Sequence, residues 1–246
     1  MNRRHQYIAL VTGLPYLGRL FTRKEVPISR YRLRQRLSML EPEHARLIRA
    51  VIDLTAWAGV AKYSEDSEVI RQAKEVVAEL KDYPDLQHLV GARMETRTLI
   101  AALRRRRNGQ EVAGDVTTWG YGRWCGRIQA NWTDPAFGLG HFMPWVGEAS
   151  RLLREDDHIG MERLALTQVF RQLDHYNGLH EFDFEAVVIY ALRWVIVERW
   201  SRYNTENAAR RLEALSAAAL GAAGGEPAGR EDLFTDSSAA FEGASS

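Results

Sequence analysis

Cysteine is almost missing from the sequence, since Cys125 is the only one among 246 residues. A single thiol cannot form an intramolecular disulfide, which excludes the disulfide-stabilised class of small secreted domains. The composition favours a reducing compartment. We therefore expect a cytoplasmic protein in which Cys125 is a buried, unreactive thiol.

Long apolar runs are missing as well. The longest, AVVIYALRWVIV at residues 186–197, contains Arg193 and is too short to cross a bilayer. Near the start a basic segment precedes a short apolar run, but Pro15 interrupts that run and no small-x-small cleavage site follows. We expect no signal peptide, and we expect any membrane contact to be made through a partner.

Motifs for catalysis or nucleotide binding are missing too. The sequence contains neither GK[ST] nor G-x-S-x-G, and GYGRWCG at residues 120–126 does not match G-x-G-x-x-G. The glycines of this stretch are better explained by close packing of backbone and indole rings. We expect no catalytic residue and no cofactor.

One polar stretch, LDHYNGLHEFDFE at residues 173–185, resembles a metal-binding cluster. It contains His175, His180 and several carboxylates, but the spacing does not match H-E-x-x-H or a di-iron Glu-x-x-His pair. An Asn-Gly turn followed by Asp183 at a helix N-cap explains the same residues. The sequence therefore predicts no metal site.

The charge is nearly balanced in total but uneven along the chain. The net charge is +1, yet residues 1–130 carry 23 Lys and Arg against 14 Asp and Glu, while residues 131–246 carry 10 against 18. The basic and acidic halves should prefer different neighbours. Lysine is scarce and the C-terminal half is acidic, which argues mildly against a general polyanion-binding protein.

Helical periodicity dominates the chain. Ser29 can cap a first helix, Pro42, Pro84 and Pro144 suit first turns, and Asp183 can cap the last helix. The expected helices cover residues 30–40, 42–58 with a stop at Gly59, 67–80, 84–107 with a left-handed cap at Asn108–Gly109, 144–155, 159–176 and 184–218. Between residues 114 and 145, short helices joined by irregular turns are expected.

Both ends of the chain depart from this pattern. YIALVTGLPYL at residues 7–17 is β-branched and aromatic and is closed by Gly13 and Pro15, which favours an extended segment. Residues 221–246 have the composition of a flexible acidic tail. The sequence thus predicts an all-α, multi-helix bundle over residues 1–220, a short extended N-terminal segment and a disordered C-terminal tail.

An arginine run ends the segment ETRTLIAALRRRRNGQE at residues 95–111. These cations can complement a helix C-terminus, contact a partner, or bind nucleic acid together with the aromatic residues that follow. The candidate interface residues are Arg104, Arg105, Arg106, Arg107, Trp119, Tyr121, Arg123 and Trp124.

The aromatic segment NWTDPAFGLGHFMPW at residues 131–145 predicts a rigid connection packed onto a helical body. An exposed docking ridge made by its aromatic residues is the alternative. Those residues are Trp132, Phe137, Phe142 and Trp145.

Taken in order, five segments of the chain resemble a bacterial family encoded with V-type ATPase subunits. They are YIALVTGLPYL, ETRTLIAALRRRRNG, NWTDPAFGLGHFMPW, ERLALTQVFRQLD and FDFEAVVIYALRWVIVERWSRYNTENA. That family is similar, more distantly, to the C/d family of V/A-type ATPase subunits, named C in prokaryotes and d in eukaryotes. The corresponding helix pattern, E-x-x-N-L-x-x-x-x-R-x-K-x-x-G, is matched by Glu95, Leu99, Arg104, Arg106 and Gly109, while Thr98 replaces the amide. A second pattern of that family, a tyrosine followed later by an Arg-Trp pair, is matched by Tyr190, Arg199 and Trp200.

The resemblance implies a V-type ATPase C/d-like fold and a non-catalytic part of the central stalk, or rotor, of a V/A-type ATPase or ATP synthase. The implied partners are the central shaft of the soluble head and the membrane rotor ring, during proton or sodium transport. The implied location is the cytoplasmic face of the membrane, with no nucleic acid expected. Two alternatives stay open: an arginine-rich nucleic-acid-binding module, and a transient ATPase assembly or regulatory factor.

Overall fold

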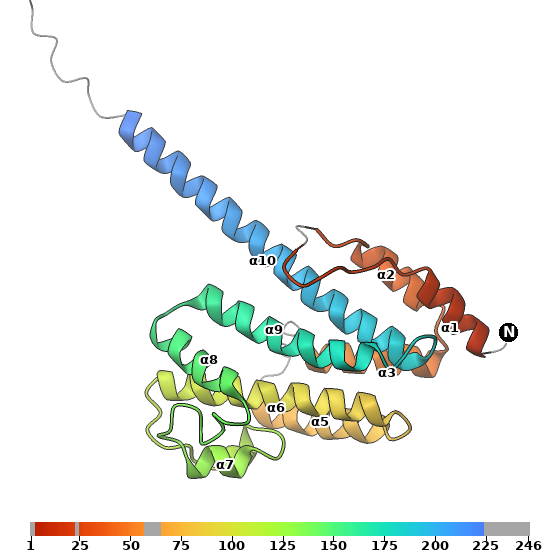
Figure 1. Cartoon of the computed structure of the whole chain (residues 1–246), viewed down its shortest axis with the longest axis horizontal. Helices are drawn as coiled ribbons and strands as arrows, with labels where there is room; N and C mark the ends of the chain where they lie inside the picture. The colour runs from red at the N-terminus through yellow and green to blue at the C-terminus, as the bar shows by residue number, and fades with distance from the viewer. Residues whose placement is uncertain (1–2, 23–24, 57–64, 224–246) are drawn as a thin grey trace, which may run out of the picture. The chain divides into compact units, whose positions relative to one another are not determined.

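The computed structural model describes residues 3–22, 25–56 and 65–223. This part of the chain contains α-helices and one short 3₁₀-helix but no β-strand, which confirms the all-α prediction (Figure 1). The elements are α1 (Arg3–Thr12), α2 (Arg30–Leu37), α3 (Pro42–Thr55), α5 (Asp66–Glu79), α6 (Pro84–Arg107), η1 (Val116–Thr118), α7 (Cys125–Ala130), α8 (Pro144–Arg154), α9 (His158–Asn177) and α10 (Phe184–Ala223).

Local signals set most helix boundaries. Prolines stand at the first turn of α3, α6 and α8, where the missing N–H has no intrahelical partner to lose. The Asp183 carboxylate accepts a hydrogen bond from the backbone N–H of Ala186 at 2.8 Å and so caps α10. Gly109, with φ +89°, ends α6 in the left-handed conformation that the sequence predicted. Helix α3 ends at Thr55, and the stop predicted at Gly59 lies outside the described residues.

The predicted extended segment at residues 7–17 is wrong in its first half, because Tyr7 to Thr12 belong to α1. Tyr7 and Leu10 are buried in the core, and Val11 and Leu14 pack against it. This spacing places one apolar face on a helix, so tertiary packing outweighs the β-branched composition. The Tyr7 hydroxyl also lies 2.5 Å from Nδ1 of the buried His44 on α3. In the second half of the segment, Gly13 and Leu14 form a turn and a bend, and residues 15–18 have no regular structure.

The larger core lies among α3, α5, α6, α9 and α10. Figure 1 shows α5 and α6 side by side, and α6 also contacts α3, α8 and α9. Val187, Val188, Ile189 and Ala191 of α10 are all fully buried. A helix that is buried on every side belongs in the interior of a bundle. The first half of α10 therefore has the central position that its apolar sequence predicted.

Two further cores complete the body. One joins the C-terminal half of α6 to α7, α8 and the segment between them, with Leu99, Ile128 and Phe137 among its buried members. The other is small and contains Leu33 of α2 and Trp194 of α10.

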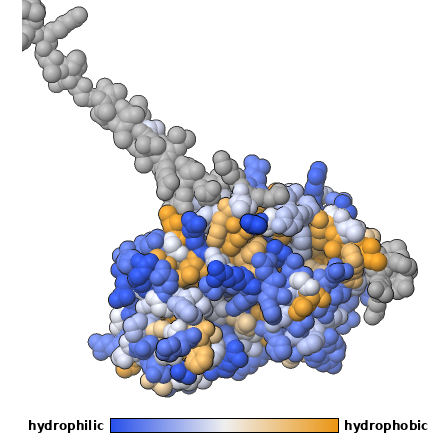
Figure 2. All heavy atoms as spheres, viewed as in Figure 1, coloured by the Kyte–Doolittle hydropathy of each residue, from blue (hydrophilic) through white to orange (hydrophobic). Residues whose placement is uncertain are grey.

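By its internal contacts the chain divides into two units, residues 1–201 and 202–246. The predicted tail begins at Gly221, whereas α10 extends to Ala223, and the rest of the tail lies outside the described residues. No helix in the described ranges combines the length and apolar character needed to span a bilayer. Figure 2 shows hydrophilic residues over most of the visible face of the first unit, with hydrophobic residues in scattered patches.

Candidate functional site

The arginine run occupies the last turn of α6, where four backbone carbonyls lack helical partners. The turn is closed by backbone hydrogen bonds from Asn108 N to Arg104 O (2.9 Å) and from Gln110 N to Arg105 O (3.1 Å). Consecutive helical residues point about 100° apart, so the four side chains leave the helix in different directions. Each arginine consequently has its own surroundings.

Arg106 connects α6 to the chain between α7 and α8. Its guanidinium donates hydrogen bonds to the carbonyl oxygens of Trp132 (3.0 Å), Asp134 (2.5 Å) and Pro135 (2.9 Å), and to Ser150 Oγ (3.1 Å). It also lies over the Phe137 ring, 4.5 Å from the centroid. Burial lowers the pKa of Arg106, while the nearby Asp134 acts in the opposite direction. We call these contacts the Arg106 network.

The segment that receives Arg106 is itself held in a defined shape. The Asp134 carboxylate accepts hydrogen bonds from the backbone N–H groups of Gly138 and Ala136, both at 2.8 Å, and these bonds lower the pKa of Asp134. Phe137 adopts φ +55° and is fully buried. Of the four aromatic residues in this segment, Trp132 and Phe137 are buried, Trp145 is partly buried and Phe142 is 68% exposed. Core packing therefore explains most of them, and of the four only Phe142 is available for docking.

Arg105 and Arg107 pair with acidic residues of neighbouring elements. Arg105 Nη2 lies 2.8 Å from Asp66 Oδ2 at the start of α5, and its guanidinium lies over the Trp119 ring at 4.6 Å. Arg107 pairs with Asp156, between α8 and α9. Asp66 also lies 3.6 Å from Arg97, two turns earlier on α6. These pairs neutralise part of the positive charge of the arginine run, which a nucleic-acid-binding surface would use.

Arg104 differs from the other three. Its side chain is exposed and has neither an ion pair nor a side-chain hydrogen bond within the described ranges. Partner contact at the arginine run stays a prediction. Of the four arginines, Arg104 is the best placed to contact a partner.

The other predicted residues lie beside the middle of α6. The Tyr121 N–H donates to Thr98 Oγ1 at 2.7 Å, and that hydroxyl lies 3.1 Å from the carbonyl oxygens of Met94 and Tyr121. The Arg123 N–H donates to the Glu95 carboxylate at 3.2 Å, and the Arg123 side chain, 72% exposed, lies over the Trp124 ring. Thr98 thus fastens the 119–124 segment to α6, a role that its sequence position did not reveal.

The structure therefore separates the eight candidates into two groups. Arg104 to Arg107 and Trp119 lie near the C-terminal end of α6, whereas Tyr121, Arg123 and Trp124 lie beside residues 95–98. Residues 95 and 105 are roughly 15 Å apart along the helix axis at 1.5 Å per residue. Cys125, next to the second group, is buried as predicted, and burial raises the pKa of its thiol.

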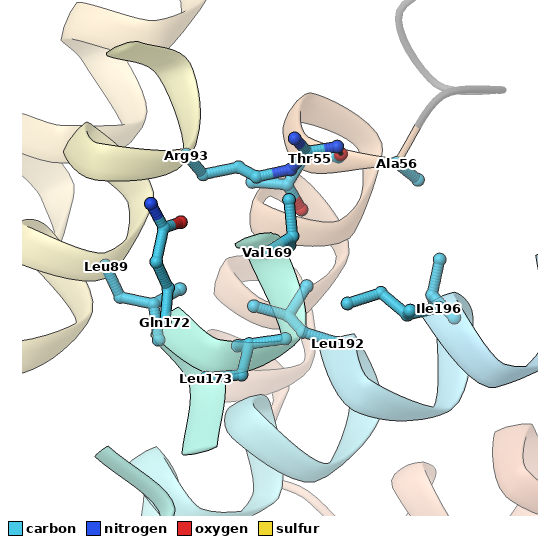
Figure 3. A pocket seen from close by; sticks show the side chains of 10 residues that line it. Thr55, Ala56, Leu89, Arg93, Val169, Gln172, Leu173, Leu192 and Ile196 are labelled. Atoms are coloured by element: carbon cyan, nitrogen blue, oxygen red, sulfur yellow. Dashed lines mark hydrogen bonds between the residues drawn. The ribbon is translucent and has the colours of Figure 1, made fainter. Parts of the chain in front are cut away.

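A small cavity lies among α3, α6, α9 and α10 (Figure 3). Apolar side chains such as Leu89, Val169 and Leu192 line it, with Thr55, Arg93 and Gln172 as polar members. Its volume is about 20 Å³, enough for one water molecule but too small for a metabolite. Arg93 donates to the Thr55 carbonyl at 3.3 Å, and burial lowers its pKa to about 9. This cavity does not provide a ligand site.

His180 lies just before α10, next to the start of α6. Its Nδ1 is 2.9 Å from Asp183 Oδ2 and its Nε2 is 3.1 Å from Asp85 Oδ2. Potential ligand atoms of His180, Asp183 and Glu185 lie within 4.8 Å of one another. Both ring nitrogens already face carboxylates, so a metal would have to displace one of these contacts. The arrangement fits an imidazolium bridge between two helix starts better than it fits a metal.

The His180 bridge predicts a pH dependence of stability. Burial lowers the pKa of His180, but its hydrogen bonds with Asp183 and Asp85 and the charges of Asp183 and Glu185 outweigh burial and raise it. The folded chain therefore holds this proton at a higher pH than the unfolded chain does. The stabilisation is complete below the pKa of His180 in the unfolded chain, about 6.5. It is lost as the pH rises through the higher pKa of His180 in the folded chain.

We expect the free energy of unfolding, measured in urea at pH 6 and pH 9, to fall over this interval in the wild type. His180→Gln should reduce the fall, because the substituted side chain does not titrate. His141→Gln is the matched control, since His141 is exposed. An equal fall in the wild type and His180→Gln would show that the bridge has no such effect.

Sequence reasoning missed the acceptors of the arginine run. Asp66, Asp156 and Ser150 lie 39, 49 and 44 positions from their arginines, so no local spacing links them.

No protein-family model matches the chain, and neither a curated protein nor a solved structure has significant similarity to it.

Proposed function

We propose that this chain is a non-catalytic subunit of the central stalk of a V/A-type ATPase, coupling the shaft of the soluble head to the membrane rotor ring during proton or sodium transport. The sequence resemblance suggests this function. The observation that supports it further is that most residues on which the resemblance depends hold helices together in the structure. These positions lie mainly on α6 and α10.

On α6, the resemblance positions hold the helix in place. Glu95 accepts a hydrogen bond from Arg123, Leu99 is 1% exposed, Arg106 forms its network, and Gly109 ends the helix with φ +89°. Arg104, the remaining position, is exposed. This division supports the proposal, because a coupling subunit needs both stiffness and an exposed position that can contact a partner.

On α10, the later pattern also joins distant parts of the chain. The Tyr190 hydroxyl donates to the Pro15 carbonyl at 2.8 Å, and the Arg199 guanidinium pairs with Glu162 of α9 at 2.5 Å. The Trp200 ring lies edge-on to Phe21, with centroids 4.7 Å apart. These contacts fasten the N-terminal segment and α9 to the central helix.

A subunit that transmits torque must resist bending. Close-packed interiors have low compressibility and transmit strain, and ion pairs between helices oppose sliding. The described body has both features, since Arg105 connects α6 to the start of α5 and Arg107 connects it to the turn between α8 and α9. As such a subunit, the chain would lie at the cytoplasmic face of the membrane and contact the membrane only through its partners.

The test is purification of detergent-solubilised complexes through an affinity tag on the full chain. We expect the shaft and ring subunits to be recovered with it at a fixed ratio, measured by quantitative mass spectrometry and native mass spectrometry. Capture of the ATPase in substoichiometric amounts would favour an assembly factor instead. Purification of the chain without any ATPase subunit would refute the proposal.

A further inference from the structure

Helix α2 carries a dense positive charge. Its eight residues, RYRLRQRL, include four arginines and no acidic residue, and Leu33 is its only buried member. Arg30 pairs with Glu198. Arg32, Arg34 and Arg36 are exposed, and their side chains form neither ion pairs nor hydrogen bonds within the part of the chain that the structure describes.

Arg32 and Arg34 flank the side of α2 that lies opposite Leu33, whereas Arg36 lies nearer to Leu33 and its guanidinium is close to Gly13. At about 100° per residue, Tyr31 and Gln35 lie opposite Leu33, with Arg34 and Arg32 on either side of them and Arg36 next to Arg32. Tyr31 is 77% exposed, so its ring is available for contact. We call Tyr31, Arg32, Arg34, Gln35 and Arg36 the α2 face.

The opposite side of α2 is fixed firmly to α10. Leu33 packs with Trp194, whose indole N–H donates to the Ile28 carbonyl at 2.9 Å. The Arg30 guanidinium contacts both carboxylate oxygens of Glu198, with Nη2 2.6 Å from Oε2 and Nε 3.1 Å from Oε1. A partner would therefore meet a surface that is already ordered, which lowers the entropic cost of binding.

We propose that the α2 face binds an acidic α-helical segment of another protein. Carboxylates four residues apart on a helix are about 5–6 Å apart, a spacing that Arg32 and Arg36, also four residues apart, can match. Each guanidinium can hold a carboxylate through two hydrogen bonds, and the exposed tyrosine ring supplies apolar contact area.

Nucleic acid fits this face less well. Eight helical residues extend only about 12 Å. Acidic residues lie on both sides in sequence, with Glu25 before α2 and Glu41 and Glu43 after it. A continuous polyanion would extend well past this short helix, whereas a short acidic segment need not. The inference stands on α2 alone and does not depend on the ATPase assignment.

The test measures binding of a fluorescein-labelled, glutamate-rich helical peptide to the full chain by fluorescence anisotropy at low salt. Arg32→Glu/Arg34→Glu/Arg36→Glu should weaken binding by about tenfold or more. The matched control, Arg49→Glu/Arg154→Glu/Arg171→Glu, makes the same charge change at exposed arginines elsewhere and should change affinity by less than about twofold. Arg34→Glu alone and Tyr31→Ala, each also expected to weaken binding, serve if the triple variant does not fold.

The same peptide with every glutamate replaced by glutamine should bind much more weakly. Equal loss of affinity in the two triple variants would mean that only net charge matters, and would overturn the proposal. Tighter binding of single-stranded DNA, or of phosphatidylglycerol vesicles, than of the acidic peptide would overturn it as well.

Discussion

Arg106→Ala is expected to lower the free energy of unfolding by about 2–4 kcal/mol, measured by urea denaturation with circular dichroism. The substitution removes a guanidinium that donates to three carbonyl oxygens and to Ser150 Oγ and covers the Phe137 ring. Hydrogen bonds from a charged donor are stronger than neutral ones. In Arg106→Ala the four acceptors lose this donor and are partly shielded from water.

Arg104→Ala is the matched control, because it removes an exposed arginine from the same turn of α6 and should change stability by less than about 0.5 kcal/mol. Arg106→Lys should recover less than half of the loss, since an ammonium cannot reproduce the planar fork that reaches four acceptors. A similar loss in Arg104→Ala and Arg106→Ala would contradict the importance given to the Arg106 network.

Phe137→Ala is expected to cost about 3–5 kcal/mol, the usual range for a large aromatic residue removed from a core. Phe137 is fully buried and packs against the Trp132 ring, with centroids 5.5 Å apart. Its loss would leave a cavity beneath Arg106. The readout is again the urea transition, with calorimetry as a second measurement.

Phe142→Ala provides the comparison for Phe137→Ala, because it removes the same side chain from a site that is 68% exposed. Its effect on stability should stay within about 0.5 kcal/mol. An equal loss of stability in Phe137→Ala and Phe142→Ala would show that residues 131–145 are not packed as described.

The helical architecture could be predicted because its boundaries are local. Pro84 begins α6 and Asn108–Gly109 ends it, and Asp183 caps α10, all as the sequence indicated. Helix α1 was not predicted, because its β-branched and aromatic residue types favour an extended segment although their spacing is helical. The burial of Tyr7 and Leu10 with partial burial of Val11 follows the helical period.

The candidate site was predictable only in part, for a physical reason. The sequence identifies the arginines at the end of α6, but whether a cation meets solvent or a carboxylate depends on the three-dimensional path of the chain. Arg105 reaches Asp66 and Arg107 reaches Asp156, partners 39 and 49 positions away. The α2 face was not predicted either, because the spacing of Leu33 and Leu37 indicates only the buried side of that helix.

The contacts between Arg106 and the backbone of residues 132–135 have an evolutionary consequence. Surface connections usually tolerate insertions and deletions, because their length matters little to the body beneath them. Here one guanidinium binds three carbonyl oxygens of a single short stretch of chain. Adding or removing a single residue would shift those oxygens out of reach, so the length of this connection should vary less among relatives than its amino-acid identities.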